Sequence, residues 1–369
     1  MELNEARERI RQADEAMAAL FVRRMEAVHT VAEYKRARGL PVEDPAQEAR
    51  VLEGRGALVE DPVLREYYML FLQHVMDVSK LFQHRLTEGL RVAYSGVEGA
   101  FAHIAARRIF PDGTPVSCPG FEEAYHAVAS GDCDTAVLPI ENSYAGEVGQ
   151  VLDLMFSGNL YVNGVYDLAV TQNLLGLPGA DRSAIRTVVS HPQALQQCQT
   201  YIREHGLTAR SAENTALAAR QVAEGRDPAV AAIASAETAE RYGLEILERQ
   251  LNASETNTTR FAVFSRTLAQ MGKREGGGFL LLFMVKDEAG GLAKAINIIS
   301  AYGYNMRVLR SRPMKNLSWH YYFYAELEGD DCSEDGRRML SALHGVCPMV
   351  KVAGHYSAPE NAHQGGETI

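Results

Sequence analysis

The chain has 369 residues, 46% of them apolar, which is enough for two or three domains with buried cores. Its formal net charge of -10 argues against a nucleic-acid partner, because phosphate binding requires a surplus of lysine and arginine on some face. The five cysteines lack C-x-x-C spacing, and the charged N-terminus is unlike a signal peptide, so we expect a cytoplasmic protein. The longest apolar run, 279–285, is too short to cross a bilayer, so we expect no membrane partner.

The first 88 residues carry the pattern of an all-helical domain. From Leu3 to Arg38 there is neither proline nor glycine, and apolar side chains recur on one stripe at about 100° per residue. Asp44 and Asp61 each precede a proline, which predicts capped second and third helices, the third ending near His84. We therefore expect domain 1–88 to consist of three helices.

Two cations interrupt the apolar stripe of the first helix. Arg24 and Lys35 point within about 40° of its centre, which indicates acidic partners or an anionic ligand, because burying them unpaired would cost several kcal/mol each. The alternative is that each extends its charged end from the stripe edge to water. Arg7 lies about 25 Å from Arg24 along the helix, so both can act on one small molecule only across a dimer.

This pattern resembles the all-helical chorismate mutase family, an intertwined dimer whose long first helix supplies cations to two shared sites. The resemblance implies that Arg7 comes from the partner subunit, that Arg24 binds a carboxylate and that Lys35 contacts the ether oxygen. A Claisen rearrangement needs only a compressed substrate conformer and donors at the oxygen that gains negative charge. Neither a cofactor nor a metal is therefore predicted.

The same resemblance extends to the second and third helices. It implies that Asp44 and Glu48 bind the ring-hydroxyl side of the substrate. Ser79 and Gln83, spaced i, i+4 on the third helix, would line the site, with Gln83 sharing the ether oxygen. Gln47 stands where the family usually has arginine, which leaves open whether the helical domain is an efficient mutase or serves only dimerisation.

From residue 89 to 268 the pattern is that of an α/β domain. Arg91–Tyr94 predicts a strand, which leads through a glycine-containing loop into a helix from Ala100 to Phe110. Strand and helix signals then alternate at 135–140, 148–156, 187–190, 192–204, 215–223 and 229–234. The polar residues of interest are expected just after strands, where α/β folds place their clefts.

Three polar stretches stand beside apolar strands in this domain, at 138–143, 190–197 and 257–261. A threonine next to an arginine can donate a hydrogen bond to a leaving oxygen while the guanidinium holds a carboxylate. Together these stretches resemble the signature of prephenate dehydratase, over roughly residues 90–266. The resemblance implies two lobes similar to periplasmic binding proteins, with the active site between them.

The resemblance also implies roles for individual residues. Loss of the ring hydroxyl of prephenate with carbon dioxide requires a donor at the leaving oxygen, and we expect Thr259 there, with Glu141 and Asn142 beside the leaving group or the ring. Substrate binding is expected from Ser190, His191, Gln197, Thr258, Arg260 and Phe261. For two of these residues a purely structural role stays open as an alternative to a role at the site. His191 would then only begin the helix before Pro192, and Glu141 would only serve as a helix cap.

The substrate of this domain stays open as well. Ala100 and Ala102 stand where prephenate dehydratases usually have hydroxyl residues, whereas arogenate dehydratases often have alanine. Arogenate, the amino analogue of prephenate, is therefore an alternative substrate. A non-catalytic prephenate sensor is a further alternative, which the joint presence of Glu141, Asn142 and Thr259 disfavours.

The last part of the sequence predicts an α+β module. Gly276–Gly278 indicates a linker, and strands at 279–285, 304–311, 319–327 and 349–356 alternate with helices at 292–301 and 333–343. This β-α-β-β-α-β order is typical of ferredoxin-like modules and resembles, over 275–358, the ACT domain that binds phenylalanine. Its regulatory motifs correspond to Gly290, Gly291, Leu292, Arg310, Ser311, Arg312 and Pro313. The polar tail 359–369 is predicted to be disordered.

Arg310 departs from the ACT family, which usually has glutamate there. Its guanidinium would repel the amino group of phenylalanine or pair with a different acidic partner, so we expect weakened inhibition by phenylalanine. The order of the three parts resembles that of bifunctional chorismate mutase/prephenate dehydratases of phenylalanine biosynthesis. It implies chorismate, prephenate and phenylalanine as small-molecule partners, and a homodimer or dimer-based oligomer.

Overall fold

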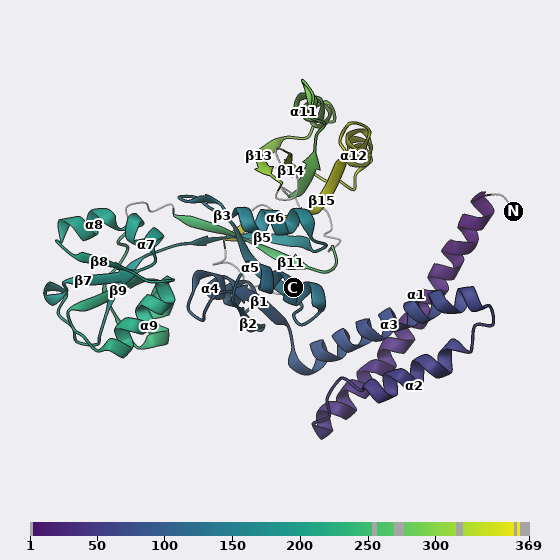
Figure 1. Cartoon of the computed structure of the whole chain (residues 1–369), viewed down its shortest axis with the longest axis horizontal. Coiled ribbons are helices and arrows are strands. Elements are labelled where there is room, and N and C mark those ends of the chain that lie inside the picture. The colour runs from purple at the N-terminus through teal and green to yellow at the C-terminus, as the bar shows by residue number, and fades with distance from the viewer. Residues whose placement is uncertain (1–2, 253–256, 269–276, 315–319, 358–359, 362–369) are drawn as a thin grey trace. The chain divides into compact units, whose positions relative to one another are not determined.

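The computed structural model describes residues 3–252, 257–268, 277–314, 320–357 and 360–361 (Figure 1). The chain divides into two compact units, Met1–Arg91 and Val92–Ile369. None of the helices in the described ranges combines the length and the apolar content that crossing a membrane requires.

The first unit consists of three helices, as the sequence predicts: α1 (Leu3–Arg38), α2 (Pro45–Gly56) and α3 (Pro62–Glu88). Asp44 caps α2 by accepting a hydrogen bond from the backbone N–H of Gln47 at 3.0 Å, and Asp61 caps α3 in the same way. The helix α3 packs along both α1 and α2. Among the described residues of α1, Ala32 alone is buried, so most of its apolar stripe is exposed in a single chain.

The α/β part begins with a first lobe, whose strands lie in the order β5-β11-β3-β1-β2. They are β1 (Arg91–Ser95), β2 (Thr114–Cys118), β3 (Thr135–Asn142), β5 (Tyr161–Ala169) and β11 (Thr258–Ser265), with the short β4 (Gly146–Glu147) beside β3. The accompanying helices are α4 (Phe101–Ile109), α5 (Phe121–Ser130) and α6 (Gly149–Ser157). β1 runs parallel to β3, whereas β11 returns antiparallel between β3 and β5.

Several of these strands differ from the sequence prediction, which contains no strand at β2, β4 or β5. β11 begins at Thr258, so the polar residues before Ala262 lie within the strand rather than in a loop. β3 likewise extends through Glu141 and Asn142, which were expected just after it. The pattern predicts no strand at β5, because the buried residues of that segment do not alternate strictly along the chain.

The second lobe is a separate sheet with the strand order β10-β6-β9-β7-β8. Its strands are β6 (Asn173–Gly176), β7 (Thr187–Ser190), β8 (Thr208–Ser211), β9 (Val230–Ala234) and β10 (Glu245–Glu248). Its α-helices are α7 (Pro192–Gln197), α8 (Gln199–Glu204), α9 (Thr215–Gly225) and α10 (Ala236–Tyr242), with a 3-10 turn at Arg182–Ala184. The helices α7 and α8 cover one face of this sheet and α9 covers the other (Figure 1). The segment 192–204 is thus two helices, which meet at Cys198.

The C-terminal module has the predicted β-α-β-β-α-β order. Its elements are β12 (Gly278–Met284), α11 (Gly291–Ala301), β13 (Met306–Pro313), β14 (Tyr321–Glu328), α12 (Glu334–Val346) and β15 (Met349–Tyr356). The strands lie in the antiparallel order β13-β14-β12-β15, which is a ferredoxin-like arrangement.

Several predicted features fall at the edges of the described residues. Gly276 of the predicted linker and Trp319 at the predicted start of the third strand lie outside them, while Gly278 already belongs to β12. In the tail that was predicted to be disordered, Glu360–Asn361 forms the short strand β16, which pairs with β5. Residues 359 and 362–369 of that tail lie outside the described residues.

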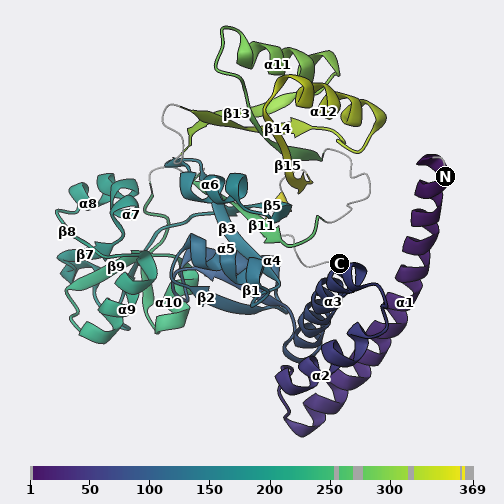
Figure 2. The ribbon, with the colours of Figure 1, turned by 45° about the vertical axis from the view of Figure 1, so that its right-hand side comes forward.

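The sheet of the C-terminal module lies between its own two helices and the first lobe (Figure 2). Leu281 packs with α11 and α12, whereas the adjacent Leu280 faces the other way and shares a core with α6. β15 also continues the sheet of the first lobe by pairing with β5 at Gly354 and Val162. Glycine is required there, because a Cβ at Gly354 would overlap the Val162 carbonyl oxygen.

Candidate active sites

In the helical unit, two cations of α1 lie against polar groups rather than acids. The Arg24 guanidinium bonds to the Ser79 hydroxyl and to the Val75 carbonyl at 3.4 Å, and burial lowers the pKa of Arg24. The Lys35 ammonium donates to the Val42 carbonyl at 2.5 Å. Within the described residues no carboxylate pairs with Arg24 or Lys35, which favours the anionic ligand over the acidic side chains that the sequence left as an alternative.

Gln83 gives a second indication of a ligand in this unit. Ser79 and Gln83 are both buried on α3, and Gln83 Nε2 donates to the Ser79 carbonyl at 3.4 Å. Gln83 Oε1 is buried, and no described residue forms a hydrogen bond with it. An unsatisfied buried polar atom costs roughly 1–3 kcal/mol, so Gln83 Oε1 is suited to accept a hydrogen bond from a donor outside the described residues of a single chain.

The remaining mutase candidates are more exposed. Glu48 pairs with Lys80 of α3 at 2.9 Å, and the sequence motifs did not point to Lys80. Asp44 is exposed and caps α2, while Arg7 is exposed near the start of α1. One chain therefore brings together Arg24, Ser79 and Gln83, and it leaves Arg7 away from them on the same long helix.

In the first lobe, Asn142 and Thr259 face each other across the antiparallel pair of β3 and β11. Asn142 Nδ2 donates to the Thr259 hydroxyl at 2.9 Å and to Asn257 Oδ1 at 3.0 Å. Asn142 Oδ1 accepts the backbone N–H groups of Tyr144 and Ala145 at 3.0 and 2.9 Å. Because Thr259 accepts a hydrogen bond from Asn142, its own hydroxyl hydrogen can be donated to a ligand oxygen.

Glu141 and Arg260 lie on the opposite face of the same strand pair, because successive side chains of a strand alternate. Arg260 bonds to Asp167 at 3.0 Å and lies 3.5 Å from Glu326 and 3.9 Å from Glu141. Burial acts to lower the pKa of Arg260, but the bond to Asp167 and the charges of Glu326 and Glu141 raise it. The structure thus places Glu141 on the face opposite to Asn142, and the guanidinium of Arg260, which was expected to hold a substrate carboxylate, contacts acidic side chains of the chain itself.

The predicted binding residues of the second lobe lie at the end of β7. The buried Ser190 hydroxyl donates to the Ile233 carbonyl at 2.6 Å. His191 is the N-cap of α7, with Nδ1 accepting the N–H of Gln193 at 3.2 Å, and burial lowers the pKa of His191. The structure thus favours the helix-starting role for His191.

Two residues of the third motif have structural roles. Phe261 is a fully buried core side chain rather than a surface for substrate. Thr258 forms two hydrogen bonds with Ser143. The Thr258 N–H donates to the Ser143 hydroxyl at 3.0 Å, and the Thr258 carbonyl accepts from the Ser143 N–H at 2.9 Å. These contacts hold the start of β11 against the loop after β3.

Two amide side chains were missed as site residues, although their surroundings point to a ligand. Gln172, between β5 and β6, donates from Nε2 to Gln197 Oε1 at 3.5 Å, and its own Oε1 is buried without a hydrogen-bond partner. Asn257 Nδ2, beside Asn142, is also buried and has no partner within the ranges 3–252, 257–268, 277–314 and 320–357. The signal available in the sequence is the polar run Thr171–Asn173 between apolar segments, which no motif covered.

A cavity of about 210 Å³ opens between the two lobes. Phe101 and Arg108 of α4 line it from the first lobe, and Ser235, Glu237 and Arg249 line it from the second. Arg108 forms an ion pair with Glu237, which ties the lobes together at this point. The two lobes thus enclose a space with mixed polar and apolar walls next to the crossing segment that carries Gln172.

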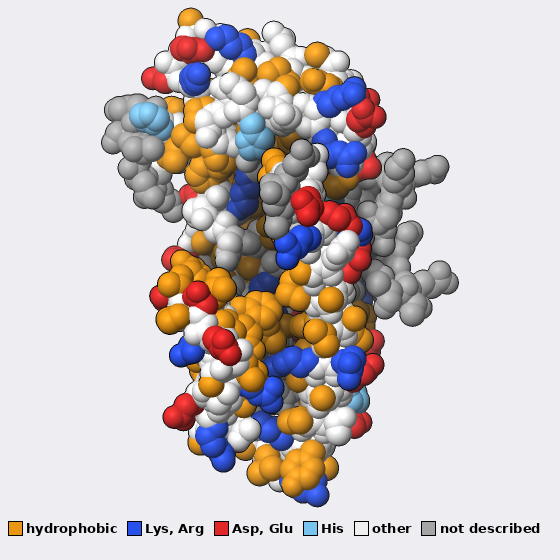
Figure 3. Space-filling model, turned by 90° about the vertical axis from the view of Figure 1, so that its right-hand side faces the viewer, with side chains coloured by type: hydrophobic (Ala, Val, Ile, Leu, Met, Phe, Trp, Pro, Cys, Tyr) orange, Lys and Arg blue, Asp and Glu red, His pale blue; other side chains and the backbone are white. Residues whose placement is uncertain are grey.

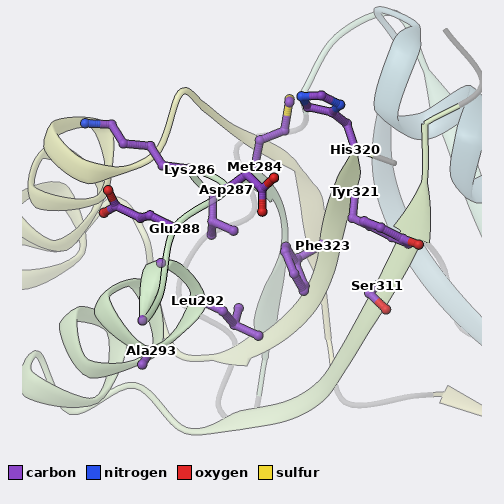
Figure 4. A pocket seen from close by; sticks show the side chains of 13 residues that line it. Met284, Lys286, Asp287, Glu288, Leu292, Ala293, Ser311, His320, Tyr321 and Phe323 are labelled. Atoms are coloured by element: carbon purple, nitrogen blue, oxygen red, sulfur yellow. The ribbon is translucent and has the colours of Figure 1, made fainter. Parts of the chain in front are cut away.

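The C-terminal module contains a larger cavity, of about 450 Å³, beside the turn that starts α11. Gly290 adopts a φ of 81° in this turn, a conformation that favours glycine. Figure 4 shows the side chains of Leu292 and Phe323 pointing toward the cavity. Ser311 of β13 also lines it, together with Gly290 and Gly291, so four of the regulatory positions predicted from the sequence lie around one space.

Arg310 and Arg312 point away from this cavity, toward the first lobe. Arg310 pairs with Glu141, and Arg312 pairs with Glu147 at 2.8 Å and with Asp153 at 3.1 Å. Arg310 therefore pairs with a different acidic partner, which is the second of the two possibilities expected from the sequence. It does not line the cavity. Pro313 ends β13.

One group of side chains in the C-terminal module has the composition of a metal site. Possible ligand atoms of Asp331, Cys332 and His355 lie within 4.8 Å of one another, and the described residues contain no other such group. Asp331 and His355 bond to each other at 2.6 Å, so an ion would have to replace this contact.

Comparison with known proteins gives matches in both the helical unit and the α/β part of the chain. The family model of prephenate dehydratase matches residues 92–268, and that of chorismate mutase type II matches residues 6–84. The bifunctional chorismate mutase/prephenate dehydratase of Escherichia coli (strain K12) is 30% identical over 365 residues, covering 95% of this chain and 95% of its own. The chloroplastic arogenate dehydratase/prephenate dehydratase 2 of Arabidopsis thaliana is 32% identical over 307 residues, covering 76% of this chain and 81% of its own.

A solved structure extends the likeness to the fold. The prephenate dehydratase of Arthrobacter aurescens, crystallised in complex with L-Phe, is 26% identical and superposes with a TM-score of 0.68. It covers 73% of this chain and 90% of its own. With a match along nearly its whole length to the bacterial relative, this chain belongs to the family of bifunctional chorismate mutase/prephenate dehydratases.

Proposed function

We propose that the protein rearranges chorismate to prephenate and then converts prephenate to phenylpyruvate, as an enzyme of phenylalanine biosynthesis. The observation that carries this proposal is that, in both described parts of the chain, buried amide atoms have no hydrogen-bond partner among the described residues. Gln83 supplies one in the helical unit, and Gln172 and Asn257 supply two in the α/β part. Buried polar atoms are rarely left unsatisfied, so each place is suited to a ligand that completes the hydrogen bonds.

In the helical unit the proposed reaction breaks one carbon–oxygen bond and forms one carbon–carbon bond within the substrate, and nothing is transferred to the protein. Lys35 donates to the ether oxygen as negative charge develops on it, and Arg24 holds a carboxylate. Gln83 shares the ether oxygen through the Nε2 hydrogen that the Ser79 carbonyl does not accept. A preorganised donor of this kind contributes about 10²–10³-fold to the rate. Lys80 positions Glu48 for the ring hydroxyl through their ion pair.

In the α/β part, prephenate loses its ring carboxylate as carbon dioxide and its ring hydroxyl as water. The electron pair of the broken carbon–carbon bond enters the ring as the carbon–oxygen bond breaks, and the leaving oxygen takes up a proton. Thr259, oriented by Asn142, donates a hydrogen bond to that oxygen. Asn257 Nδ2 can donate to an oxygen that remains on the substrate, whereas Gln172 Oε1 can only accept a hydrogen bond from a hydroxyl group.

Incubation of the purified protein with chorismate, followed by mass spectrometry of chorismate, prephenate and phenylpyruvate, tests both steps. Prephenate is expected to appear first and phenylpyruvate second. Parallel incubations with prephenate and arogenate decide which dehydratase substrate is preferred. Turnover of added prephenate with unreacted chorismate would assign the helical unit to dimerisation, and binding without any product would identify a sensor.

A dimer through the helical unit is the second element of the proposal. Ile10 and Leu20 on α1 expose 61% and 60% of their surface, and Phe71 on α3 exposes 53%. Apolar side chains, orange in Figure 3, gather on the surface of these helices. Monomeric proteins rarely leave so much contiguous apolar surface in water. A second copy with an antiparallel α1 would cover it and bring Arg7 of the partner subunit to the site of Arg24.

Mixing the inactive Arg7→Ala and Lys35→Ala proteins is expected to restore chorismate mutase activity. At full subunit exchange about half of the dimers are hybrids, and one of the two sites in each hybrid holds only native residues, so about a quarter of the native activity returns. Arg24→Ala mixed with Lys35→Ala is the matched control, because both substitutions then affect the same side of each site and no site is intact. Recovery in both mixtures, or in neither after exchange proven by native mass spectrometry, would exclude the shared site.

The third element of the proposal concerns the C-terminal module, which we propose to be an ACT domain. Its cavity binds phenylalanine, and bound phenylalanine weakly inhibits the dehydratase. The cavity of about 450 Å³ suits a single amino acid, with Leu292 and Phe323 for an aromatic ring and Asp287 for an amino group (Figure 4). The complex of the Arthrobacter aurescens relative with L-Phe supports the same ligand class.

Leu292→Trp is expected to lower the affinity for phenylalanine at least tenfold, because the larger side chain fills the space for the ring. Isothermal titration calorimetry measures this directly, with glycine as the control ligand that lacks a ring. Mutase and dehydratase rates without phenylalanine are expected to stay native. Unchanged phenylalanine affinity would place the effector elsewhere.

A further inference from the structure

Strand β13 has different neighbours on its two faces. Ser311 lines the large cavity of the C-terminal module. Arg310 and Arg312 point to the opposite face, because side chains alternate along a strand, and both pair with acidic residues of the first lobe. One strand therefore touches the proposed effector space with one face and the catalytic lobe with the other.

The contact of Arg310 lies directly behind the proposed dehydratase site. Its guanidinium pairs with Glu141, which is adjacent in β3 to Asn142. Glu141 stands opposite Arg260 in the strand register, just as Asn142 stands opposite Thr259. One peptide unit joins Glu141 to Asn142, whose side chain donates to the Thr259 hydroxyl at 2.9 Å.

The ion pair between Arg310 and Glu141 belongs to a larger, partly buried cluster of charged side chains. The carboxylates of Glu141, Asp167 and Glu326 meet the guanidiniums of Arg260 and Arg310. Glu326 exposes 7% of its side chain, and the other four expose 22% to 26%. Without Arg310, three carboxylates would share one guanidinium. Like charges repel strongly when they are partly shielded from water, so β3 and β11 would shift at this point.

We propose that Arg310 is a positioning residue for the dehydratase: by holding Glu141 it sets the placement of Asn142 and Thr259, and it couples the cavity on the other face of β13 to that site. This rests on the proposed function, in which Asn142 and Thr259 serve the dehydratase step. A ligand that moves β13 changes the contacts on both faces of this strand. An amino acid bound in the cavity therefore alters the ion pair between Arg310 and Glu141.

The test compares Arg310→Gln, Arg310→Lys and the control Arg307→Gln in the full chain. Arg307 lies on the same strand but pairs with Glu328 inside the C-terminal module. Arg310→Gln is expected to lower kcat for prephenate roughly tenfold with KM changed less than twofold, and Arg310→Lys to recover most of the loss. Arg307→Gln is expected to stay within about twofold of native, and the mutase rate to stay native in all three.

Phenylalanine gives a second readout of the same variants. It is expected to bind Arg310→Gln with native affinity in calorimetry but no longer to change kcat, because the cavity face of β13 is intact and the other face has lost its partner. In a Glu141→Gln background, Arg310→Gln is expected to have no further effect, since the pair is already broken. This double variant also decides the outcome where Arg310→Gln alone does not fold.

Several results would overturn the proposal. One is an Arg310→Gln enzyme that matches Arg307→Gln in kcat and in inhibition by phenylalanine. Another is a loss confined to KM, or an undiminished effect of Arg310→Gln in the Glu141→Gln background. A native chain that does not convert prephenate at all would instead defeat the proposed function, which separates the two failures.

Discussion

Thr259→Val is expected to lower the dehydratase kcat by about 10²–10⁴-fold and to leave the mutase rate native. Valine has nearly the same shape as threonine, so β11 keeps its pairing with β3 and β5, but the donor for the leaving oxygen is lost. Asn142 Nδ2 also loses an acceptor at 2.9 Å while keeping Asn257. Incubation with chorismate should then accumulate prephenate.

Thr135→Val is the matched control for this substitution. Thr135 lies at the other end of the same pair of strands, and its hydroxyl donates to the Phe264 carbonyl at 2.8 Å. Its loss is expected to cost about 1 kcal/mol of stability without lowering kcat. A Thr259→Val enzyme with the kcat of Thr135→Val would remove the threonine hydroxyl from the mechanism.

Lys35→Ala is expected to lower the mutase kcat by about 10²–10³-fold or more, while added prephenate is still converted to phenylpyruvate at the native rate. The ammonium is partly buried near the C-terminal end of α1 and bonds to one carbonyl, so it retains hydrogens for the ether oxygen. Removing it takes away a cation where charge develops in the transition state. Following chorismate loss and phenylpyruvate formation in separate assays checks both halves of the expectation.

Arg36→Ala controls for the loss of positive charge at the end of this helix. Arg36 is exposed in the last turn of α1, where a cation interacts favourably with the helix dipole. This variant is expected to keep the native mutase rate. Equal losses of both activities in Lys35→Ala would contradict two separate sites, because that result requires a common structural defect.

Much of the element order was predictable, because its signals are local. Asp44 and Asp61 before prolines marked the starts of α2 and α3, and the uninterrupted stripe marked α1 from Leu3 to Arg38. The C-terminal module was likewise read from its alternating strand and helix patterns. β5 and the first residues of β11 were not predictable in this way, since neighbouring strands rather than local propensity supply their hydrogen bonds.

The candidate dehydratase site likewise has residues that the sequence motifs identified and residues whose placement only the structure shows. Short motifs singled out Asn142 and Thr259, which the structure joins by a hydrogen bond across 117 residues of chain. The same motifs could not show that Glu141 and Arg260 face the other way, because a side chain's face depends on the register of β3 against β11. Gln172 belonged to no motif, and its importance comes from burial without a partner.

The sequence by itself determined the helices of the first unit and the element order of the C-terminal module, because periodicity and capping act over a few residues. The residues of both proposed sites came from the resemblance of short motifs to known families. The tertiary structure alone decided which of those residues meet. Arg310 and Glu141 are 169 residues apart, and only the packing of the C-terminal sheet on the first lobe brings them together. Strand register then places Arg310 and Ser311 on opposite faces of β13, because a strand turns each successive side chain to the other side.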